Sequence, residues 1–427
     1  MWRWLVFFAA CAGGCGPTAP DAGDASADAD VDAAPDPASY LPVLAVPVYS
    51  LPRLDLLFVV EDGPGMLAKQ QRLAAAIGTL TASFDTLRGG RPDLHIGVVG
   101  SDLGTSGSNG APPAPALGAC SGTGKAGALQ STAANTGAFI SDAHGTVSYT
   151  GALADVLAAT LQLGESGCDF PQPLAAMATA LATPGFVRPN GNLAIVLVGD
   201  ADDCSVKDPA LFGPADATLG PQTRFRCFAQ GVKCAPDIPA TPGLKNLCDA
   251  RHGDAYLDDV EHFAAVLNDL EIDPAHQILV ATIGGAGSVV VDSGPTLSPA
   301  CTFGAGETAE TGVRLKALGK LMPEHAAASI CATDDTAALT AVTAATRSLV
   351  GDPCIAVPLS TPPDCIVDDV VGVAHATIPA CSAQATKPCW RLATDATACP
   401  LAQHLALVVD RSVPAAPGTV DELRCRP

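Results

Sequence analysis

Six acidic residues stand where apolar runs of the sequence end, and carboxylates grouped in this way can hold a cation: Glu61, Asp62, Asp102, Asp200, Asp202 and Asp203. Residues 54–60 (Leu-Asp-Leu-Leu-Phe-Val-Val) and 193–199 (Leu-Ala-Ile-Val-Leu-Val-Gly) are typical of strands buried on both faces. Open sheets bind ligands at the carboxyl ends of their strands, so we expect the six carboxylates to lie close together. Like charges so placed repel one another unless a cation or protons intervene.

Glu61, Asp200 and Asp202 are the residues that we predict as ligands of a divalent cation. Magnesium prefers near-octahedral oxygen coordination at about 2.0–2.1 Å, whereas calcium accepts more varied geometry, so either ion is a candidate. The alternative is that these acids are solvated loop residues that bind no ion. The sequence leaves both interpretations open.

The segments that must position these acids alternate between strands and helices. Four segments have the apolar composition of strands: residues 54–60, 95–100, 193–199 and 277–283. Five segments repeat apolar residues at helical spacing: residues 66–87, 171–182, 256–270, 312–322 and 335–349. Repeated strand–helix units predict an α/β fold with a Rossmann-like, mostly parallel sheet and helices on both faces.

Two segments, residues 101–150 and 201–254, interrupt this alternation and are rich in Gly, Pro, Asp and Cys. At about 50 residues each they are too long for plain connections. Because both contain cysteines, we interpret them as loop insertions held by disulfides.

The cysteine count supports disulfides in the whole body of the chain. Sixteen cysteines are present, and setting Cys11 and Cys15 aside leaves fourteen, an even number. No Cys-x-x-Cys occurs and no histidine stands at ligand spacing from a cysteine pair, which argues against zinc. Six of the fourteen lie in residues 353–427, where short β-like runs at 365–373 and 404–409 predict a small Cys-rich β-containing module. The connectivity stays undetermined.

The first residues have the order of an export signal: Arg3 supplies a positive charge, residues 5–10 are apolar, and small residues follow. This apolar run is far shorter than the roughly 18–20 residues that span a bilayer. The Ala-Gly-Gly-Cys at residues 12–15 resembles the lipobox of bacterial lipoproteins, which implies that Cys15 carries fatty acids such as palmitate. Cys11 is a competing lipidation site, and a secretory signal without lipid is an alternative.

A spacer follows the lipidation signal. Residues 16–38 are mostly Ala, Asp, Gly, Pro and Ser, with six Asp and no basic residue. Such a segment stays extended and solvated, so we predict an acidic disordered tether over residues 16–50. No Asp follows Cys15 directly, which by analogy with lipoprotein sorting favours the outer membrane or cell surface over the inner membrane. The net charge of −21 argues against nucleic acid as a partner.

The body, residues 51–352, resembles the von Willebrand factor A domain. Residues 54–66 (Leu-Asp-Leu-Leu-Phe-Val-Val-Glu-Asp-Gly-Pro-Gly-Met) are similar to its first strand and Asp-x-Ser-x-Ser loop, and residues 193–205 to a later strand and its metal-site Asp. The Gly-Cys-Asp-Phe-Pro-Gln at residues 167–172 and the Asp-Asp-Cys-Ser at 202–205 are similar to stretches of bacterial surface lipoproteins built on this fold. The resemblance implies adhesion or other protein–protein recognition, with a magnesium-type ion at the site.

The metal-binding pattern of this family is degenerate here. Glu61 replaces the first Asp, Gly63 and Gly65 replace the two serines, and no clear Thr stands near residues 166–168. Only Asp200 matches the pattern. Losing two hydroxyls removes ligands that water would have to replace, so the resemblance implies a weakened or inactive metal site.

Signals for enzymes are weak. Residues 118–126 approximate a P-loop but lack its first Gly and its final Ser or Thr, and no His-Glu-x-x-His or Gly-x-Ser-x-Gly occurs. Asp202 and Asp203 with Glu61 could act as acid and base, yet the sequence supplies no nucleophile or oxyanion stabiliser. We therefore predict a non-enzymatic, lipid-anchored binding protein with a protein ligand at the cell envelope and no small-molecule substrate. An acid-cluster hydrolase and a structural envelope lipoprotein are the alternatives.

Overall fold

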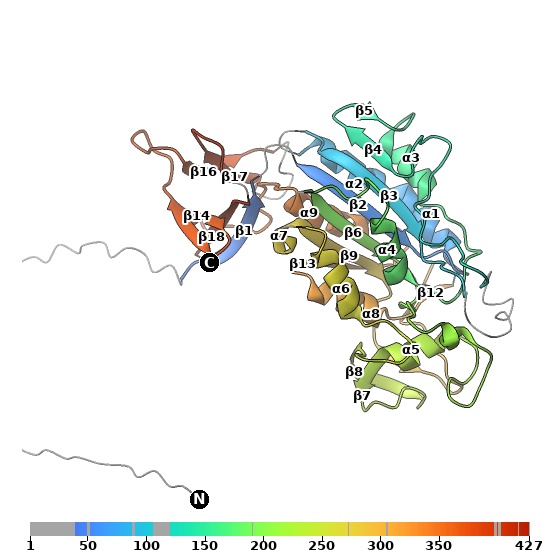
Figure 1. Ribbon diagram of the computed structural model, residues 1–427. Helices are drawn as coiled ribbons and strands as arrows, with labels where there is room; N and C mark the ends of the chain where they lie inside the picture. Colours follow the sequence, from blue (N-terminus) through green and yellow to red (C-terminus); the bar gives the residue numbers. More distant parts are fainter. Residues whose placement is uncertain are drawn as a thin grey trace, which may run out of the picture. The chain divides into compact units, whose positions relative to one another are not determined.

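Figure 1 shows the computed structural model, which describes residues 39–48, 52–87, 90–105, 120–189, 191–271, 273–304, 306–396, 399, 403–416 and 418–426. The predictions for Cys11, Cys15 and most of the tether fall on residues 1–38, outside the described residues. In the described part of the chain, no helix is both long and apolar enough to cross a membrane.

The predicted sheet is present and has seven strands in the order β13-β9-β6-β2-β3-β4-β5 (Figure 1). Its strands are β2 (Arg53–Val60), β3 (Asp93–Gly100), β4 (Ile140–Ala143), β5 (Thr146–Val147), β6 (Asn192–Val198), β9 (Ile278–Gly284) and β13 (Glu324–Ser329). All neighbours pair in parallel except β4, which is antiparallel to both β3 and β5. Val60 lies beside Gly100 on one side and Val198 on the other. The residues that follow β2, β3, β6 and β9 therefore meet at one edge, which we call the carboxyl edge.

Helices cover both faces of this sheet (Figure 1). The helices are α1 (Leu67–Ala76), α2 (Gly78–Asp85), α3 (Leu153–Thr160) and α9 (Thr336–Leu349) on one face, and α4 (Pro173–Leu181), α6 (Val260–Asn268) and α8 (Val313–Leu321) on the other. Side chains of a strand alternate between faces, so Leu56 and Phe58 pack with the first group while Leu57 and Val59 pack with the second. The near-continuous apolar run of β2 follows from this double burial.

Three elements of the sheet domain differ from expectation. The single helix predicted over residues 66–87 is two helices, since α1 ends at Ala76 and α2 begins at Gly78, a weak helix former. Helix α3 and strand β13 were not predicted. The β13 sequence, Glu-His-Ala-Ala-Ala-Ser, lacks the apolar alternation of a half-buried strand because it lies at the end of the sheet order.

Both predicted insertions contain helices or strands among their described residues. The first, residues 101–150, is not loop throughout, because β4 and β5 extend the sheet at its end; Cys120 ties it to Cys168. The second contains η3 (Pro209–Phe212), α5 (Phe225–Gly231), β7 (Val232–Ala235) and β8 (Gly243–Ala250), with β8 also pairing with β10 (Val289–Val291). Its disulfides join Cys204 to Cys227 and Cys234 to Cys248. The hairpin of β11 (Cys301–Phe303) and β12 (Glu307–Ala309) is joined to the segment after β13 by a disulfide between Cys301 and Cys331.

The predicted Cys-rich module consists of β14 (Cys365–Val371), β15 (Ala374–Ile378), β16 (Cys389–Thr394), β17 (Leu405–Asp410) and β18 (Val420–Cys425). Three disulfides lie within it: Cys354–Cys399, Cys365–Cys425 and Cys381–Cys389. Strand β1 (Leu41–Pro47) pairs with β18 and completes the order β1-β18-β14-β15. The tether expected through residue 50 is thus wrong at its end: a strand with apolar residues at 41, 43, 44 and 46 has a partner there.

Candidate functional site

Glu61 and Asp200 lie together at the carboxyl edge, as predicted. The Glu61 side chain turns toward the start of the loop after β6, and its Oε2 accepts the N–H groups of Asp200 (2.8 Å) and Ala201 (3.0 Å). A glycine at 199 makes this possible, because a Cβ there would stand 2.6 Å from that oxygen. Burial raises the pKa of Glu61 well above its ordinary value, and the charge of Asp200 raises it further.

The carboxylate of Asp200 contacts a lysine that the sequence analysis missed. Lys69 Nζ lies 2.5 Å from Asp200 Oδ2 and donates to the carbonyl oxygen of Gly65 at 2.9 Å. Both side chains are buried, at 2% and 7% exposure. The ammonium also lies 5.9 Å from the centre of the Phe303 ring. In the sequence, the one indication of this contact is that Lys69 follows Gly65 by four residues, about one helical turn.

Asp62 has a different counter-cation. Lys125 Nζ lies 2.6 Å from Asp62 Oδ2, and Asp62 Oδ1 accepts the N–H of Asp102 (3.1 Å). Lys125 belongs to the P-loop-like segment, and its ammonium here serves an ion pair within the chain. Asp102 Oδ1 in turn accepts the N–H of Gly104 (2.8 Å), which shapes a turn.

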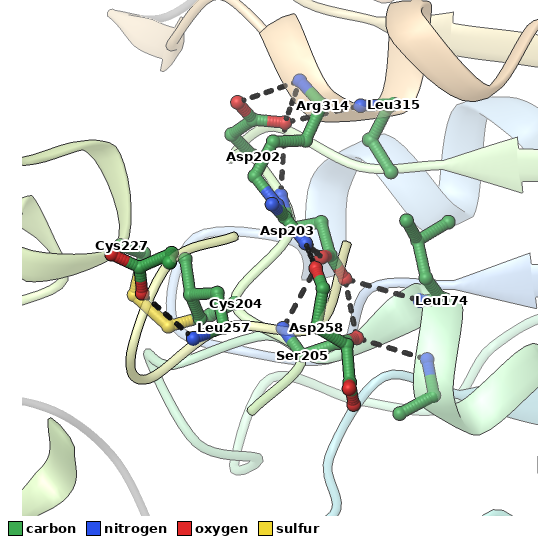
Figure 2. A network of polar contacts seen from close by, with 12 residues as sticks. Leu174, Asp202, Asp203, Cys204, Ser205, Cys227, Leu257, Asp258, Arg314 and Leu315 are labelled. Atoms are coloured by element: carbon green, nitrogen blue, oxygen red, sulfur yellow. Dashed lines mark hydrogen bonds and ion pairs between the residues drawn. A yellow bond between two sulfur atoms is a disulfide. The ribbon is translucent and has the colours of Figure 1, made fainter. Parts of the chain in front are cut away.

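Asp202 holds the start of α8 (Figure 2). Its Oδ2 accepts the N–H of Val313 (2.9 Å) and its Oδ1 the N–H of Arg314 (3.0 Å). A carboxylate at a helix N-terminus satisfies free N–H groups and the helix dipole. The groups of three potential metal ligands that lie within 4.8 Å of one another in the described part of the chain do not include Glu61, Asp200 or Asp202.

Asp203, next to Asp202, is buried against the guanidinium of Arg314 (Figure 2). Arg314 Nε and Nη2 donate to Asp203 Oδ2 at 3.1 and 3.0 Å, and the two side chains are 1% and 0% exposed. Asp203 Oδ1 accepts the hydroxyl of Ser205 (2.6 Å) and the N–H of Leu174 at the start of α4 (3.2 Å). The loop after β6 is thereby fixed to two helices.

A cleft of about 370 Å³ opens beside these groups, lined by Pro64, Asp169, Thr223, Arg224, Phe225, Thr296, Leu297 and Glu310. Arg224 crosses it, with Nη1 at 2.5 Å from Asp169 and Nη2 at 2.9 Å from Glu310. Burial raises the pKa of both carboxyl groups, although Arg224 opposes that shift. The lining comes from the loop after β2, the loop before α4, the second insertion and the segments around residues 296 and 310. Pro64 and Asp169 stand in the two motifs that carry the family resemblance, but no sequence pattern marks them or the other lining residues, which are spread over long loops, as parts of one site.

No protein-family profile and no curated protein matches this sequence. Among solved structures the chain is similar to the conserved hypothetical protein BatB from Bacteroides thetaiotaomicron, at 10% identity over 70% of this chain and 98% of that one, with a TM-score of 0.27. It is also similar to a von Willebrand factor type A protein from Catenulispora acidiphila, at 8% identity over 91% and 66%, with a TM-score of 0.30. The pilus adhesin SpaC from Lactobacillus rhamnosus GG gives 10% identity and a TM-score of 0.35; the matched region covers 89% of this chain and spans 39% of the adhesin's length. Scores this low carry no functional argument, so function is argued below from the residues themselves.

Proposed function

We propose that the chain is an exported recognition protein, attached to the cell envelope through a lipid on Cys15, that binds a partner protein in the cleft at the carboxyl edge. The observation that carries this proposal is the cleft itself. Five separate segments supply its lining, at the carboxyl edge of a sheet that is covered on both faces. Open sheets place their binding sites at this edge.

The lining of the cleft favours a protein partner with a basic or amide side chain. Apolar walls from Pro64, Phe225 and Leu297 stand beside Asp169 and Glu310, whose two carboxyl groups share one guanidinium. The net charge of −21 would steer a basic partner toward the chain. Polar groups at the floor of an apolar pocket provide orientation, and the walls provide contact area.

The hydrolase alternative has less support, so we propose a non-enzymatic role. The carboxylates of Asp202 and Asp203 accept hydrogen bonds from the backbone of α8, from Arg314 and from Ser205. Groups engaged in this way serve to hold helices and are poorly placed to exchange protons with a substrate.

Export is supported by the signal-like first residues and by the seven disulfides among the described residues, which form in oxidising compartments outside the cytoplasm. Attachment through a lipid is supported by the lipobox-like Ala-Gly-Gly-Cys at residues 12–15. The test is metabolic labelling with a fatty acid. Cys15→Ala should abolish the label and Cys11→Ala should leave it. Label that survives Cys15→Ala and disappears in Cys11→Ala would move the anchor to Cys11, and no label in the wild type would exclude a lipid anchor.

Binding in the cleft is tested with a substitution that fills it. Thr296→Arg adds bulk and charge at the exposed rim, whereas Thr340→Arg makes the same change on the exposed face of α9, outside the lining. Full-length wild type and both variants are immobilised and exposed to envelope fractions of the source bacterium. A protein retained saturably by the wild type and by Thr340→Arg, but not by Thr296→Arg, supports the proposal. Equal retention by all three would exclude the cleft, and no saturable partner would exclude recognition.

A further inference from the structure

The residues at the carboxyl edge do not fit the divalent cation that the sequence resemblance implies. Such an ion needs about six oxygen ligands. Gly63 and Gly65 offer no hydroxyls, and one oxygen of Glu61 already accepts two backbone N–H groups. Asp202, the third predicted ligand, holds the N-terminus of α8. Asp200 is the remaining predicted ligand whose carboxylate faces this position, and its Oδ2 contacts Lys69.

The ammonium of Lys69 lies where the missing ligands would converge. A Cβ built at Gly65 would stand 3.7 Å from Asp200 Oδ2 and 4.0 Å from Lys69 Nζ. A serine side chain at this position would therefore approach both groups. The backbone of Gly65, at φ +91°, is also strained for any residue with a side chain. Position 65 thus suits a glycine whose carbonyl oxygen accepts a hydrogen bond from Lys69, and it does not suit a hydroxyl ligand.

The surroundings of Lys69 Nζ are those of an ammonium site. They comprise one carbonyl oxygen at 2.9 Å, one carboxylate oxygen at 2.5 Å, and the Phe303 ring with its centre 5.9 Å away. Aromatic faces attract ammonium groups through the ring quadrupole, whereas magnesium and calcium take oxygen ligands. The position is therefore built for a singly charged organic cation supplied by α1.

Several other carboxylates near this edge also contact a basic side chain. Asp62 pairs with Lys125, Asp203 pairs with Arg314, and Arg224 lies between Asp169 and Glu310. The chain has only 23 Lys and Arg against 44 Asp and Glu, and four of those 23 are placed at this one edge. Asp62, Asp200 and Asp203 thus each contact a basic residue of the chain, and Asp169 and Glu310 share one, so these carboxylates have counter-charges without an external cation.

We propose that the ammonium of Lys69 takes the place of a divalent cation between β2 and β6, so that the carboxyl edge is complete without magnesium or calcium. A divalent ion near Asp200 would meet a positive charge a few ångströms away. This inference concerns what lies beneath the cleft and holds whether or not the proposed partner binds there.

The test is manganese binding by the full chain, followed by the loss of the free-ion signal in electron paramagnetic resonance. For each protein, manganese binding is compared with that of the same protein carrying Asp200→Asn. The difference excludes weak binding by acidic residues of the surface. We expect no difference between wild type and Asp200→Asn. Lys69→Ala should gain one site, because Asp200 Oδ2 loses its partner and Oδ1 has no hydrogen-bond partner among the described residues. Its Kd should be on the order of 10⁻⁴–10⁻³ M, as in weak extracellular calcium sites. Lys69→Ala/Asp200→Asn should lose that site, and Lys69→Arg, which keeps the charge, should not gain it.

Two results would overturn the proposal. One is a manganese site in the wild type that Asp200→Asn removes. The other is a folded Lys69→Ala that binds no more manganese than its Asp200→Asn counterpart. If Lys69→Ala does not fold, the comparison of wild type with Asp200→Asn still decides the first result. In that case Lys69→Met/Asp200→Asn, a neutral pair, should recover folding without any cation, and a cation requirement for its folding would contradict the proposal.

Discussion

The loop after β6 carries two acidic groups with opposite surroundings. Asp200 contacts one lysine and keeps one carboxylate oxygen without a hydrogen-bond partner among the described residues, and its backbone carbonyl oxygen accepts the N–H of Glu310 at the cleft. Two residues further on, Asp202 and Asp203 accept hydrogen bonds on all four oxygens, from two helices and from Arg314.

This difference shows that aspartates of one loop have different roles: Asp203 holds helices in place, whereas Asp200 lies beside the cleft. Asp203 and Arg314 are desolvated together, and a charge buried in that way depends on its partner. Asp200 stands next to the cleft that we assign to binding, and its buried Oδ1 has no hydrogen-bond partner among the described residues. The sequence Asp-Ala-Asp-Asp at residues 200–203 gives no hint of this division.

The largest expected effect comes from breaking the buried pair. Arg314→Met leaves Asp203 without a counter-charge and should lower the free energy of unfolding by about 3–5 kcal/mol. Urea titration of the disulfide-bonded chain measures this. Lys320→Met, on the exposed side of the same helix, is the control and should change stability by less than about 0.5 kcal/mol. If the two variants lost similar amounts of unfolding free energy, the buried pair of Asp203 and Arg314 would not be a main contributor to stability.

The buried carboxyl group of Glu271, which has no ion-pair partner among the described residues, should lower the stability of the fold when it ionises. Burial, reinforced by the charge of Asp55, raises the pKa of Glu271 from 4.5 to about 8, and neither of its oxygens has a hydrogen-bond partner among the described residues. The folded state therefore holds a proton that the unfolded state releases, so stability falls as pH rises from about 4.5 to about 8.

Glu271→Gln removes this loss. The variant should match the wild type near pH 4.5 and exceed it by roughly 2–3 kcal/mol near pH 9, a figure that allows for partial solvent screening. Melting curves at intervals of one pH unit measure the difference. Glu165→Gln, at an exposed glutamate, should show no such trend. A gap that is constant with pH would exclude titration of Glu271 as its cause.

The helix cap of Asp202 should contribute less than the buried pair. Asp202→Ala frees the N–H groups of Val313 and Arg314 and should cost about 1–2 kcal/mol, whereas Asp202→Asn keeps a capping oxygen and should cost less. Asp334→Ala removes an exposed cap, the acceptor of the Thr336 N–H, and provides the matched comparison. If Asp334→Ala proves as costly as Asp202→Ala, burial adds nothing to the cap.

The smallest effect is expected at Lys125. Its side chain is 27% exposed, so water screens the ion pair with Asp62 and Lys125→Met should cost about 1 kcal/mol or less. The loss should also shrink in high salt, which urea titrations at two ionic strengths would reveal. A salt-independent loss as large as that of Arg314→Met would mean that exposure does not separate the two pairs.

Much of the fold follows from local patterns in the sequence. The apolar runs of β2 and β6 predict a sheet covered on both faces, and their ends predict where Glu61 and Asp200 meet. An even count of cysteines predicts disulfides, although only the structure gives the seven pairs. The apolar runs are local patterns and the cysteine count is a sum over the chain, so both can be interpreted without knowing how the side chains pack.

The partners of the acids could not be predicted. Lys69 is separated from Asp200 by 131 residues and Arg314 from Asp203 by 111, and each stands in a helix whose pattern is equally consistent with a surface position. Arg224 lies in a long insertion with no periodicity. Which cation meets which acid depends on side-chain directions across the sheet, and neither spacing nor composition carries that information. The end of the tether was misjudged for a related reason, since β1 is recognisable only through its pairing with β18.

The pairing of β1 with β18 has a mechanical consequence. The segment that precedes β1 is the one by which we expect the chain to be held, and only residues 48–52 separate β1 from β2 in the central sheet. Tension applied between that segment and the sheet passes along the backbone of β1, which as a strand is already close to its full length of about 3.3 Å per residue. Pulling therefore lengthens the chain little at this point. The Cys-rich module contacts β1 laterally, through the pairing with β18 and through apolar side chains such as Val46, and so lies beside the path of the force.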